Sequence, residues 1–334
     1  QDRKEEKREE PRAEPQKLQP PKPVEDLLRC HLHRKPQLNC KICRRVAGTG
    51  RGGQPMPYLQ ARPATGNPEE SASARRRGAE PFEIANKQTF NLNPMLRDQI
   101  LKNTYFKTLV TIETFEGIVE QMYQYSETAE AYGGGQTTVP STLFCCLFRL
   151  FTIGISYEEL NQLLETRDLP YMRCCGFLYI RFGCPTEKLW DQLGDYCLDE
   201  EVFVPSKEQA GFEVTLGEYV EALLTDERYY YTTLPRIPMG VKKKLEERLA
   251  PLPMFRKRSA ANQRHLDLFR EPGTPVEVCD QSGEWKEGTI VQLDESFPTR
   301  LMLRVRLQDG SEGLHHLGKA ILRDERRGRG ARGR

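Results

Sequence analysis

The sequence contains few of the features that mark membrane-spanning and secreted proteins. Its 334 residues include no run of about 18 consecutive apolar residues, the length that a membrane-spanning helix requires. The first residues are charged and contain no apolar core of the kind that a secretory leader carries. We therefore expect neither a membrane contact nor a secretory signal.

Catalytic motifs are equally scarce. Only five histidines are present, and none lies in an HExxH pattern or near a GxSxG pattern. These absences exclude the common zinc protease and serine hydrolase arrangements, because both need those residues at those spacings. The sequence therefore predicts a protein that is not an enzyme and has no small-molecule substrate.

A run of three glycines at 133–135 precedes an apolar segment, which is the order found in loops that bind phosphate at a helix N-terminus. A P-loop also needs a lysine directly after its last glycine. No Lys or Arg lies between Lys107 and Arg149. We interpret the run as a flexible approach to a helix, with Pro140 in the first helical turn, where a missing N–H costs nothing.

The ten cysteines do not form a disulfide pattern. Two adjacent pairs, Cys145–Cys146 and Cys174–Cys175, lie in segments that read as helices. Neighbouring residues in a helix point to different faces, so such pairs are poorly placed for a framework of extracellular disulfides. A reducing compartment is expected.

Charge is segregated along the chain although its total is only +2. Residues 1–80 hold 18 basic and 11 acidic residues, residues 81–241 hold 12 and 23, and residues 242–334 hold 20 and 14. The acidic middle repels phosphate, whereas the basic ends attract it. Any contact with RNA is therefore expected from the ends, and the C-terminal tail offers Arg326, Arg327, Arg329 and Arg332.

The pattern of apolar residues, helix caps and turns along the chain predicts a mainly α-helical protein with a small β-barrel and basic terminal segments. Two stretches rich in Glu, Lys, Arg, Gly and Pro contain too little apolar surface to fold. The expected order is a disordered segment (1–23), a zinc knuckle (24–48), a disordered linker (49–85), a compact all-helical domain (86–250), a linker helix (251–271), a small SH3/Tudor-like barrel (272–324) and a basic tail (325–334).

The segment RCHLHRKPQLNCKIC carries the sharpest local signal. Cys40 and Cys43 have the two-residue spacing with which both sulfurs bind one Zn²⁺, and Cys30 and His33 form a second pair upstream. His31 could replace either member of that pair. Four ligands fill a tetrahedral site, so the predicted zinc is structural. Spare thiols or an interaction motif without metal remain the alternative.

Helix start signals are frequent in the middle of the chain. Asn93 followed by Pro94 is typical of an N-cap and a first helical turn. Ser156-Tyr-Glu-Glu and Thr215-Leu-Gly-Glu are capping boxes, and each opens an amphipathic stretch. We therefore expect short helices that begin at these residues.

Two segments that are apolar almost all round are expected to be the central helices. They are LFCCLFRLFTI (143–153) and YMRCCGFLYIRF (171–182), and they carry Arg149, Arg173 and Arg181. A buried guanidinium needs a carboxylate or carbonyl partner. A structural role in the core is the favoured interpretation of these arginines, and contact with a partner protein or ligand is the alternative.

After Pro272 the apolar period changes to two. PVEVCD, WKEGTIVQL and RLMLRVRLQ alternate apolar and polar residues, and Asp309-Gly310 precedes a further short run. Four or five short strands leave exposed edges unless they close, so a small barrel is expected. A cage for a methylated side chain needs about three or four aromatic residues. Only Trp285 and Phe297 are available between Pro272 and Asp324, which favours core packing of Trp285.

The helical middle resembles a known family. FNLNPMLRDQIL, the glycines followed by STLFCCLFRLF, then DLPYMRCCGFLYIRF, LWDQLGDYCLDEE and TLGEYVEALL with YYTTLPRIP together resemble the pre-mRNA-splicing factor 38 family, closer to its B-type branch. The resemblance covers roughly residues 86–250. It implies a helical, non-enzymatic nuclear scaffold of the spliceosome, associated with the U4/U6·U5 particle around activation and bound to helical and zinc-finger proteins.

These blocks also supply the expected partner-binding residues. Carboxylates in such a block are often only a solvated face, but they can equally dock a basic partner. The candidates are Asp191, Asp195, Asp199, Glu200 and Glu201, with Arg173 and Arg181. A second hypothesis makes the protein a nuclear reader, in which the barrel recognises histone or RNA-binding-protein tails through Trp285 and Phe297.

Overall fold

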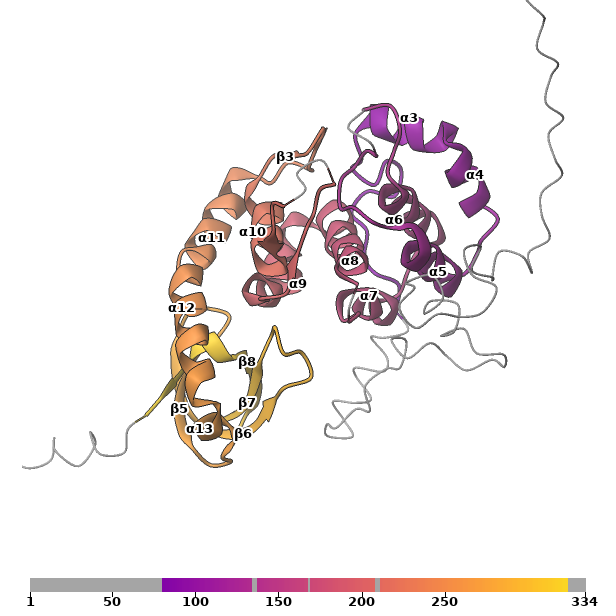
Figure 1. Cartoon of the computed structure of the whole chain (residues 1–334). Helices are drawn as coiled ribbons and strands as arrows, with labels where there is room; N and C mark the ends of the chain where they lie inside the picture. Colours follow the sequence, from indigo (N-terminus) through magenta and orange to yellow (C-terminus); the bar gives the residue numbers. More distant parts are fainter. Residues whose placement is uncertain (1–79, 134–136, 168, 208–210, 324–334) are drawn as a thin grey trace, which may run out of the picture. The chain divides into compact units, whose positions relative to one another are not determined.

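The structure is a computed structural model that describes residues 80–133, 137–167, 169–207 and 211–323, drawn in colour in Figure 1. All of these residues belong to one unit, which spans residues 61–334. The predicted disordered segment, the zinc knuckle, nearly all of the linker and the basic tail lie outside the described residues. The predictions made for those segments therefore stay predictions.

The first half of the described chain is helical, as expected (Figure 1). Its helices are α3 (Pro94–Lys102), α4 (Thr104–Leu109), α5 (Phe115–Tyr125), α6 (Thr142–Ile153), α7 (Tyr157–Leu164), α8 (Pro170–Gly183), η3 (Thr186–Lys188), α9 (Leu189–Leu193), η4 (Gly194–Leu198) and α10 (Leu216–Thr225). Two short antiparallel pairs accompany them, β1 (Val202–Phe203) with β2 (Val214–Thr215) and β3 (Arg228–Tyr229) with β4 (Thr232–Thr233).

The predicted helix starts are confirmed. The Asn93 side chain accepts a hydrogen bond from the Met95 N–H at 2.9 Å, and Pro94 opens α3. Both capping boxes form, at Ser156 before α7 and at Thr215 before α10. Each box satisfies two backbone N–H groups that the helix itself leaves unpaired.

The start of α6 differs from the prediction. Ser141 is its N-cap and accepts a hydrogen bond from the Phe144 N–H. Pro140 lies before the cap and forms an antiparallel bridge with Tyr132. The expectation that Pro140 occupies the first helical turn is wrong, because the hydroxyl of Ser141 can cap the helix and a proline side chain cannot.

The two central helices are confirmed as the core. In α8 every residue from Met172 to Gly183 is buried, and α6 buries most of its length. The rings of Phe151 and Tyr179 join the two helices by stacking, with centroids 4.3 Å apart. Such burial contributes about 1.5–3 kcal/mol for each large apolar side chain. The apolar composition of both segments is therefore explained by packing.

The backbone of α10 lies very close to the backbone of residues 197–199, at the end of η4. A Cβ on Gly217 would lie 2.5 Å from the carbonyl oxygen of Cys197 and 2.9 Å from that of Asp199. Only glycine permits this approach within a helix. The carboxylates that follow η4 are positioned by this contact.

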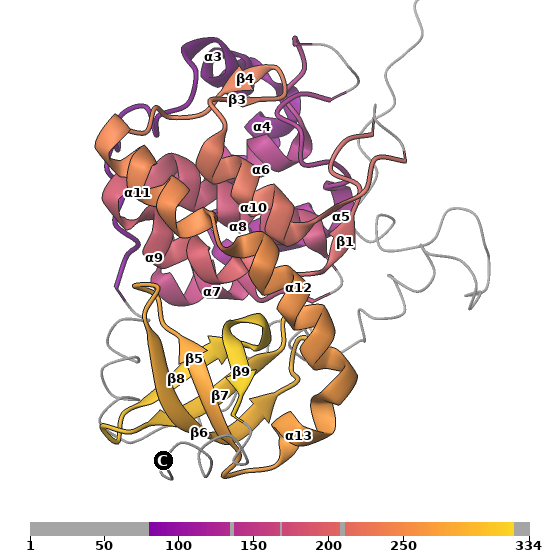
Figure 2. The same cartoon turned by 90° about the vertical axis from the view of Figure 1, so that its left-hand side faces the viewer.

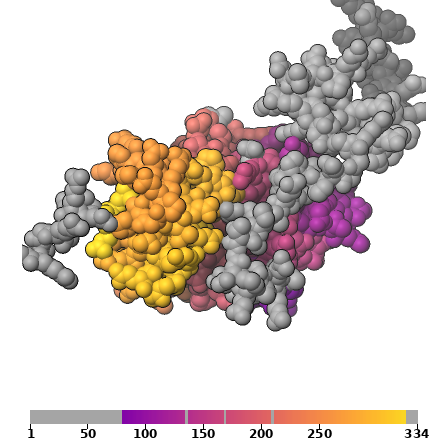
Figure 3. Space-filling model, turned by 90° about the horizontal axis from the view of Figure 1, so that it is seen from below, coloured from indigo at the N-terminus to yellow at the C-terminus, as the bar shows by residue number. Residues whose placement is uncertain are grey.

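The second half of the described chain continues with helices and ends in a sheet. The helices are α11 (Met239–Leu249), α12 (Leu252–Asn262), η5 (Gln263–His265) and α13 (Leu266–Arg270). The strands are β5 (Pro275–Cys279), β6 (Trp285–Asp294), β7 (Met302–Leu307), β8 (Glu312–His316) and, after η6 (Leu317–Lys319), β9 (Ala320–Leu322). Figure 2 shows these strands with α12 and α13 in orange and yellow, and Figure 3 shows this part of the chain in space-filling form in the same colours.

The five strands form one antiparallel sheet in the order β8-β7-β6-β5-β9. Asp309-Gly310 makes the predicted hairpin turn between β7 and β8, and Gly310 has a φ of 84°. Phe269 from α13 packs into the apolar core on one face of the sheet. Within residues 275–322, the strand pairings leave β8 and β9 at the edges. The antiparallel sheet is confirmed, whereas its closure into a barrel stays a prediction.

Candidate protein-interaction site

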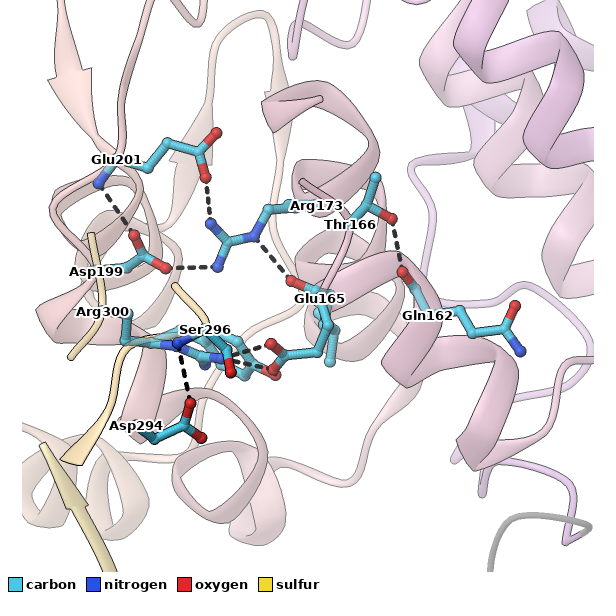
Figure 4. Close-up of polar contacts among 11 residues, drawn as sticks. Gln162, Glu165, Thr166, Arg173, Asp199, Glu201, Asp294, Ser296 and Arg300 are labelled. Carbon is cyan, nitrogen blue, oxygen red and sulfur yellow. Dashed lines mark hydrogen bonds and ion pairs between the residues drawn. The ribbon is translucent and has the colours of Figure 1, made fainter. Parts of the chain in front are cut away.

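Arg173 on α8 is at the centre of a buried ion-pair network (Figure 4). One Nη donates to the Asp199 carboxylate at 2.6 Å, the other to Glu201, and Nε donates to the Leu164 carbonyl at 2.8 Å. The side chains of Arg173 and Asp199 are both fully buried. The prediction that a core guanidinium needs carboxylate or carbonyl partners is confirmed here.

Arg181, two turns later on the same helix, is held by carbonyl groups instead. Its Nε donates to the Leu223 carbonyl at 2.6 Å and an Nη donates to that of Pro235 at 2.7 Å. Burial lowers the pKa of Arg181 to about 10. These contacts fasten the end of α10 and the chain beyond it to the central helix.

Three of the predicted partner-binding residues are therefore buried in the helical domain, where they hold its parts together. Arg173, Arg181 and Asp199 are 0%, 2% and 1% exposed, so they offer no surface that a partner protein could contact. We correct the expectation for these three residues accordingly. The sequence showed that these residues lie in the helical domain, but it could not distinguish a contact inside the domain from a contact with a partner.

A second arginine, Arg300, is bound at the end of α7 (Figure 4). Both carboxylate oxygens of Glu165 accept hydrogen bonds from Nη2 of Arg300, at 2.7 and 2.6 Å. The guanidinium carbon lies 4.5 Å from the ring centre of Tyr196 and 5.2 Å from that of Phe297. The hydroxyl of Tyr196 donates to Glu165 at 2.8 Å. Burial raises the pKa of Tyr196, which keeps that donor protonated.

A cavity of about 410 Å³ adjoins this arrangement. Asp191 and Asp195, two of the predicted partner-binding residues, line it together with Phe297. The side chains of Asp191 and Asp195 are 61% and 45% exposed, and their nearest cations, Arg248 and Lys319, lie 3.9 and 3.6 Å away. These distances are too long for strong hydrogen bonds. The two carboxylates are therefore available to a basic partner.

The remaining acidic candidates take part in contacts within the chain. Glu200 is partly buried and accepts a hydrogen bond from the side chain of Gln263 at 2.9 Å. Its backbone N–H donates to the Thr299 carbonyl at 2.8 Å. Glu201 pairs with Arg173. Of the five acidic candidates, Asp191 and Asp195 are the two that line the cavity.

The two aromatic candidates in the C-terminal sheet are in different environments. Trp285 is 39% exposed, with Arg258 stacked 4.9 Å from its ring centre and Phe255 beside it. The guanidinium carbons of Arg167 and Arg300 lie 5.1 and 5.2 Å from the centre of the Phe297 ring. Among the ring contacts of the described residues, none joins Trp285 to Phe297. The structure does not bring them together as one ligand cage.

Glu165, Tyr196 and Arg300 were not singled out from the sequence. Arg300 stands at the start of RLMLRVRLQ, where alternation explains a polar residue without any special role. Its partner Glu165 lies 135 positions away in the chain. No local pattern encodes that pairing.

The predicted zinc ligands Cys30, His33, Cys40 and Cys43 and the tail arginines lie outside the described residues. Within the described part, no group of three or more His, Cys, Asp or Glu side chains is arranged to hold a metal ion. In the same part of the chain, no helix is both long and apolar enough to cross a membrane. The zinc site therefore stays a prediction.

Comparison with known proteins gives the following matches. Residues 84–247 match the PRP38 family. The chain is 34% identical over 158 residues to Pre-mRNA splicing factor SR-like 1 of Arabidopsis thaliana, a match that covers 47% of this chain and 40% of that protein. It is 32% identical over 187 residues to Pre-mRNA-splicing factor 38B of Homo sapiens, which covers 50% of this chain and 34% of that protein.

The chain thus spans well under half the length of these relatives. A solved structure also matches, that of the Snu23-Prp38-MFAP1(217-258) complex of Chaetomium thermophilum. The TM-score is 0.44 and the sequence identity 18%, over 51% of this chain and 87% of that one.

Proposed function

Because this chain belongs to the PRP38 family through residues 84–247, we propose that it is a scaffold protein of the spliceosome that supports pre-mRNA splicing in the nucleus. Splicing factors of this family are non-enzymatic. The observation that carries the proposal is the family match over the helical domain, together with relatives whose names all describe pre-mRNA splicing factors. The acidic surface of that domain supports a role in binding proteins.

The proposed partners are spliceosomal proteins of the U4/U6·U5 particle around activation, both helical and zinc-finger proteins. Asp191 and Asp195 are the residues that we assign to their basic surfaces, because the ion pairs that these carboxylates form with other described residues are long, at 3.9 and 3.6 Å. We further assign contact with snRNA to Arg326, Arg327, Arg329 and Arg332 of the tail. Arginines spaced by glycines suit non-specific contact with RNA.

Two further parts of the proposal concern small folded modules. Cys30, His33, Cys40 and Cys43 would hold one structural zinc ion, which would order residues 24–48. The five strands would close into a Tudor/SH3-like barrel, which would leave no exposed edge to pair with strands of other chains. Neither module is required for the scaffold role of the helical domain.

Affinity purification of the tagged full chain from nuclear extract tests the scaffold proposal. Recovery of splicing proteins with U4, U5 or U6 RNA is the expected result. A chain with Asp191→Lys and Asp195→Lys should lose protein partners, whereas Asp267→Lys, a change at an exposed carboxylate of α13, should retain them. Enrichment of modified histone or RNA-binding-protein tails that is lost on Trp285→Ala, without any snRNA, would favour the reader hypothesis instead.

A further inference from the structure

The guanidinium of Arg300 has a carboxylate and two aromatic rings as neighbours, which are groups that also bind arginine side chains between protein chains. It contacts a carboxylate through Nη2, and it lies near the rings of Tyr196 and Phe297. Its side chain is 9% exposed. We propose that Glu165 and Tyr196 of the helical domain, with Phe297, form a guanidinium-binding site, and that Arg300 is the intramolecular ligand that fastens the C-terminal sheet to that domain.

The carboxylate of this site is positioned in advance. Tyr196 donates a hydrogen bond to one oxygen of Glu165, so the carboxylate cannot turn freely away from Arg300. Glu165 is only partly exposed, at 36% for its side chain. A charge-assisted hydrogen bond in such surroundings is stronger than one in open water. Tyr196 is therefore a positioning residue as well as a stacking surface.

The aromatic surfaces make the site suited to a flat cation. A guanidinium can stack on a ring face and still donate hydrogen bonds in its own plane. A lysine ammonium can keep the charge pair with Glu165 but has no plane to stack. Phe297 belongs to the same loop as Arg300, so the loop supplies both the ligand and one ring of the site.

Weaker contacts also hold the loop that carries Arg300, and the end of the sheet, against neighbouring parts of the chain. The Thr299 carbonyl accepts from the backbone N–H of Glu200 at 2.8 Å. Asn262 on α12 donates to the Leu317 and Ala320 carbonyls, both at 3.0 Å. These are neutral hydrogen bonds, each of modest net value. The Arg300–Glu165 pair is shorter than the Lys319–Asp195 pair, at 2.6 against 3.6 Å, and its carboxylate is less exposed, at 36% against 45%.

Chemical rescue in the full chain tests the proposal. Arg300→Ala empties the site, and hydrogen exchange of the amides at 296–301 and at Glu200 should become about tenfold faster as the loop is released. Guanidinium ion at about 20 mM should reverse much of this change, because a planar cation can enter the vacated site. At about 20 mM its denaturing effect is small. Arg300→Lys should fall between wild type and Arg300→Ala.

Arg306→Ala provides a matched control. Arg306 also pairs with a carboxylate, Glu312, but this pair joins β7 to β8 within the sheet. Its removal should leave exchange at Glu200 unchanged. Sodium chloride and urea at the same concentration should not rescue Arg300→Ala, because neither supplies a planar cation.

Two results would overturn the proposal. One is wild-type exchange at 296–301 in Arg300→Ala. The other is a rescue by guanidinium that persists after Glu165→Gln is added, since the site would then not depend on its carboxylate. If Arg300→Ala does not fold, Glu165→Gln and Tyr196→Phe in an otherwise unchanged chain give the same exchange readout, and wild-type values in both would contradict the proposal.

Discussion

Replacing Arg173 by methionine removes the cation from the buried network of the helical domain. Methionine has a similar reach and no charge, so packing changes little. The carboxylate of Asp199, whose side chain is fully buried, would lose its guanidinium partner. Nε would no longer donate to the Leu164 carbonyl. Arg173→Met therefore removes the donors that Arg173 provides to the buried Asp199 carboxylate, to the partly exposed Glu201 carboxylate and to the Leu164 carbonyl.

The expected loss of stability follows from this uncompensated charge. Removing one partner of a buried ion pair typically costs about 3–5 kcal/mol. For a protein of about 150–250 residues, each 1 kcal/mol lowers Tm by about 2–4 °C. We therefore expect Tm to fall by about 6–20 °C. Part of the charge on Asp199 is offset by the backbone N–H of Glu201, which donates to it at 3.0 Å, so the lower part of that range is favoured.

Thermal unfolding followed by circular dichroism measures the change. Arg248→Met is the matched control, because Arg248 is 39% exposed and its carboxylate lies 3.9 Å away; it should cost less than about 1 kcal/mol. Adding Asp199→Asn to Arg173→Met should recover at least half of the loss, since the buried charge is then gone. If Arg173→Met unfolds within about 2 °C of Arg248→Met, or if the second substitution lowers Tm further, the buried ion pair does not contribute the stability expected of it.

Three other predictions concern pH, backbone packing and metal. Burial lowers the pKa of His316 from 6.5 to about 3, so stability should be highest above pH 6.5 and fall by about 1.4 kcal/mol per pH unit below it, until about pH 3; urea unfolding at several pH values should show a smaller slope for His316→Asn. Gly217→Ala should destabilise α10 in thermal unfolding because its Cβ meets two carbonyl oxygens, whereas Gly240→Ala in α11, with no atom within 4 Å, should stabilise by up to about 1 kcal/mol. Metal analysis of a chain segment 24–48 should find one zinc equivalent that is lost on Cys40→Ser, and less than half an equivalent, unchanged by that substitution, would reject the zinc site.

The features that the sequence predicted well are those encoded by neighbouring residues. Asn93, Ser156 and Thr215 begin helices because their own side chains bond to N–H groups two or three residues later. The hairpin at Asp309-Gly310 forms because glycine accepts a positive φ. The family could be identified because several such blocks occur in a fixed order. The position of Pro140 was predicted wrongly, because Ser141, the next residue, is the N-cap of α6 and Pro140 lies before the helix.

The candidate site was predictable only in part. The block around Asp191 to Glu201 was identified as acidic and placed on the helical domain, and Asp191 and Asp195 do line a cavity there. Which carboxylate is buried and which is exposed depends on the close approach at Gly217 and on the position of α8. Trp285 and Phe297 were grouped by residue type, but strand pairing and loop position separate them.

The sequence by itself determined where helices and strands begin, which helices are central, how charge is divided along the chain, and the family to which residues 84–247 belong. These depend on spacing and on side chains that act within a few residues. Only the tertiary structure decided that Asp199 is an internal partner of Arg173 and that Arg300 binds Glu165 near the rings of Tyr196 and Phe297. Such contacts join residues far apart in the chain, and the burial that makes them strong exists only after folding.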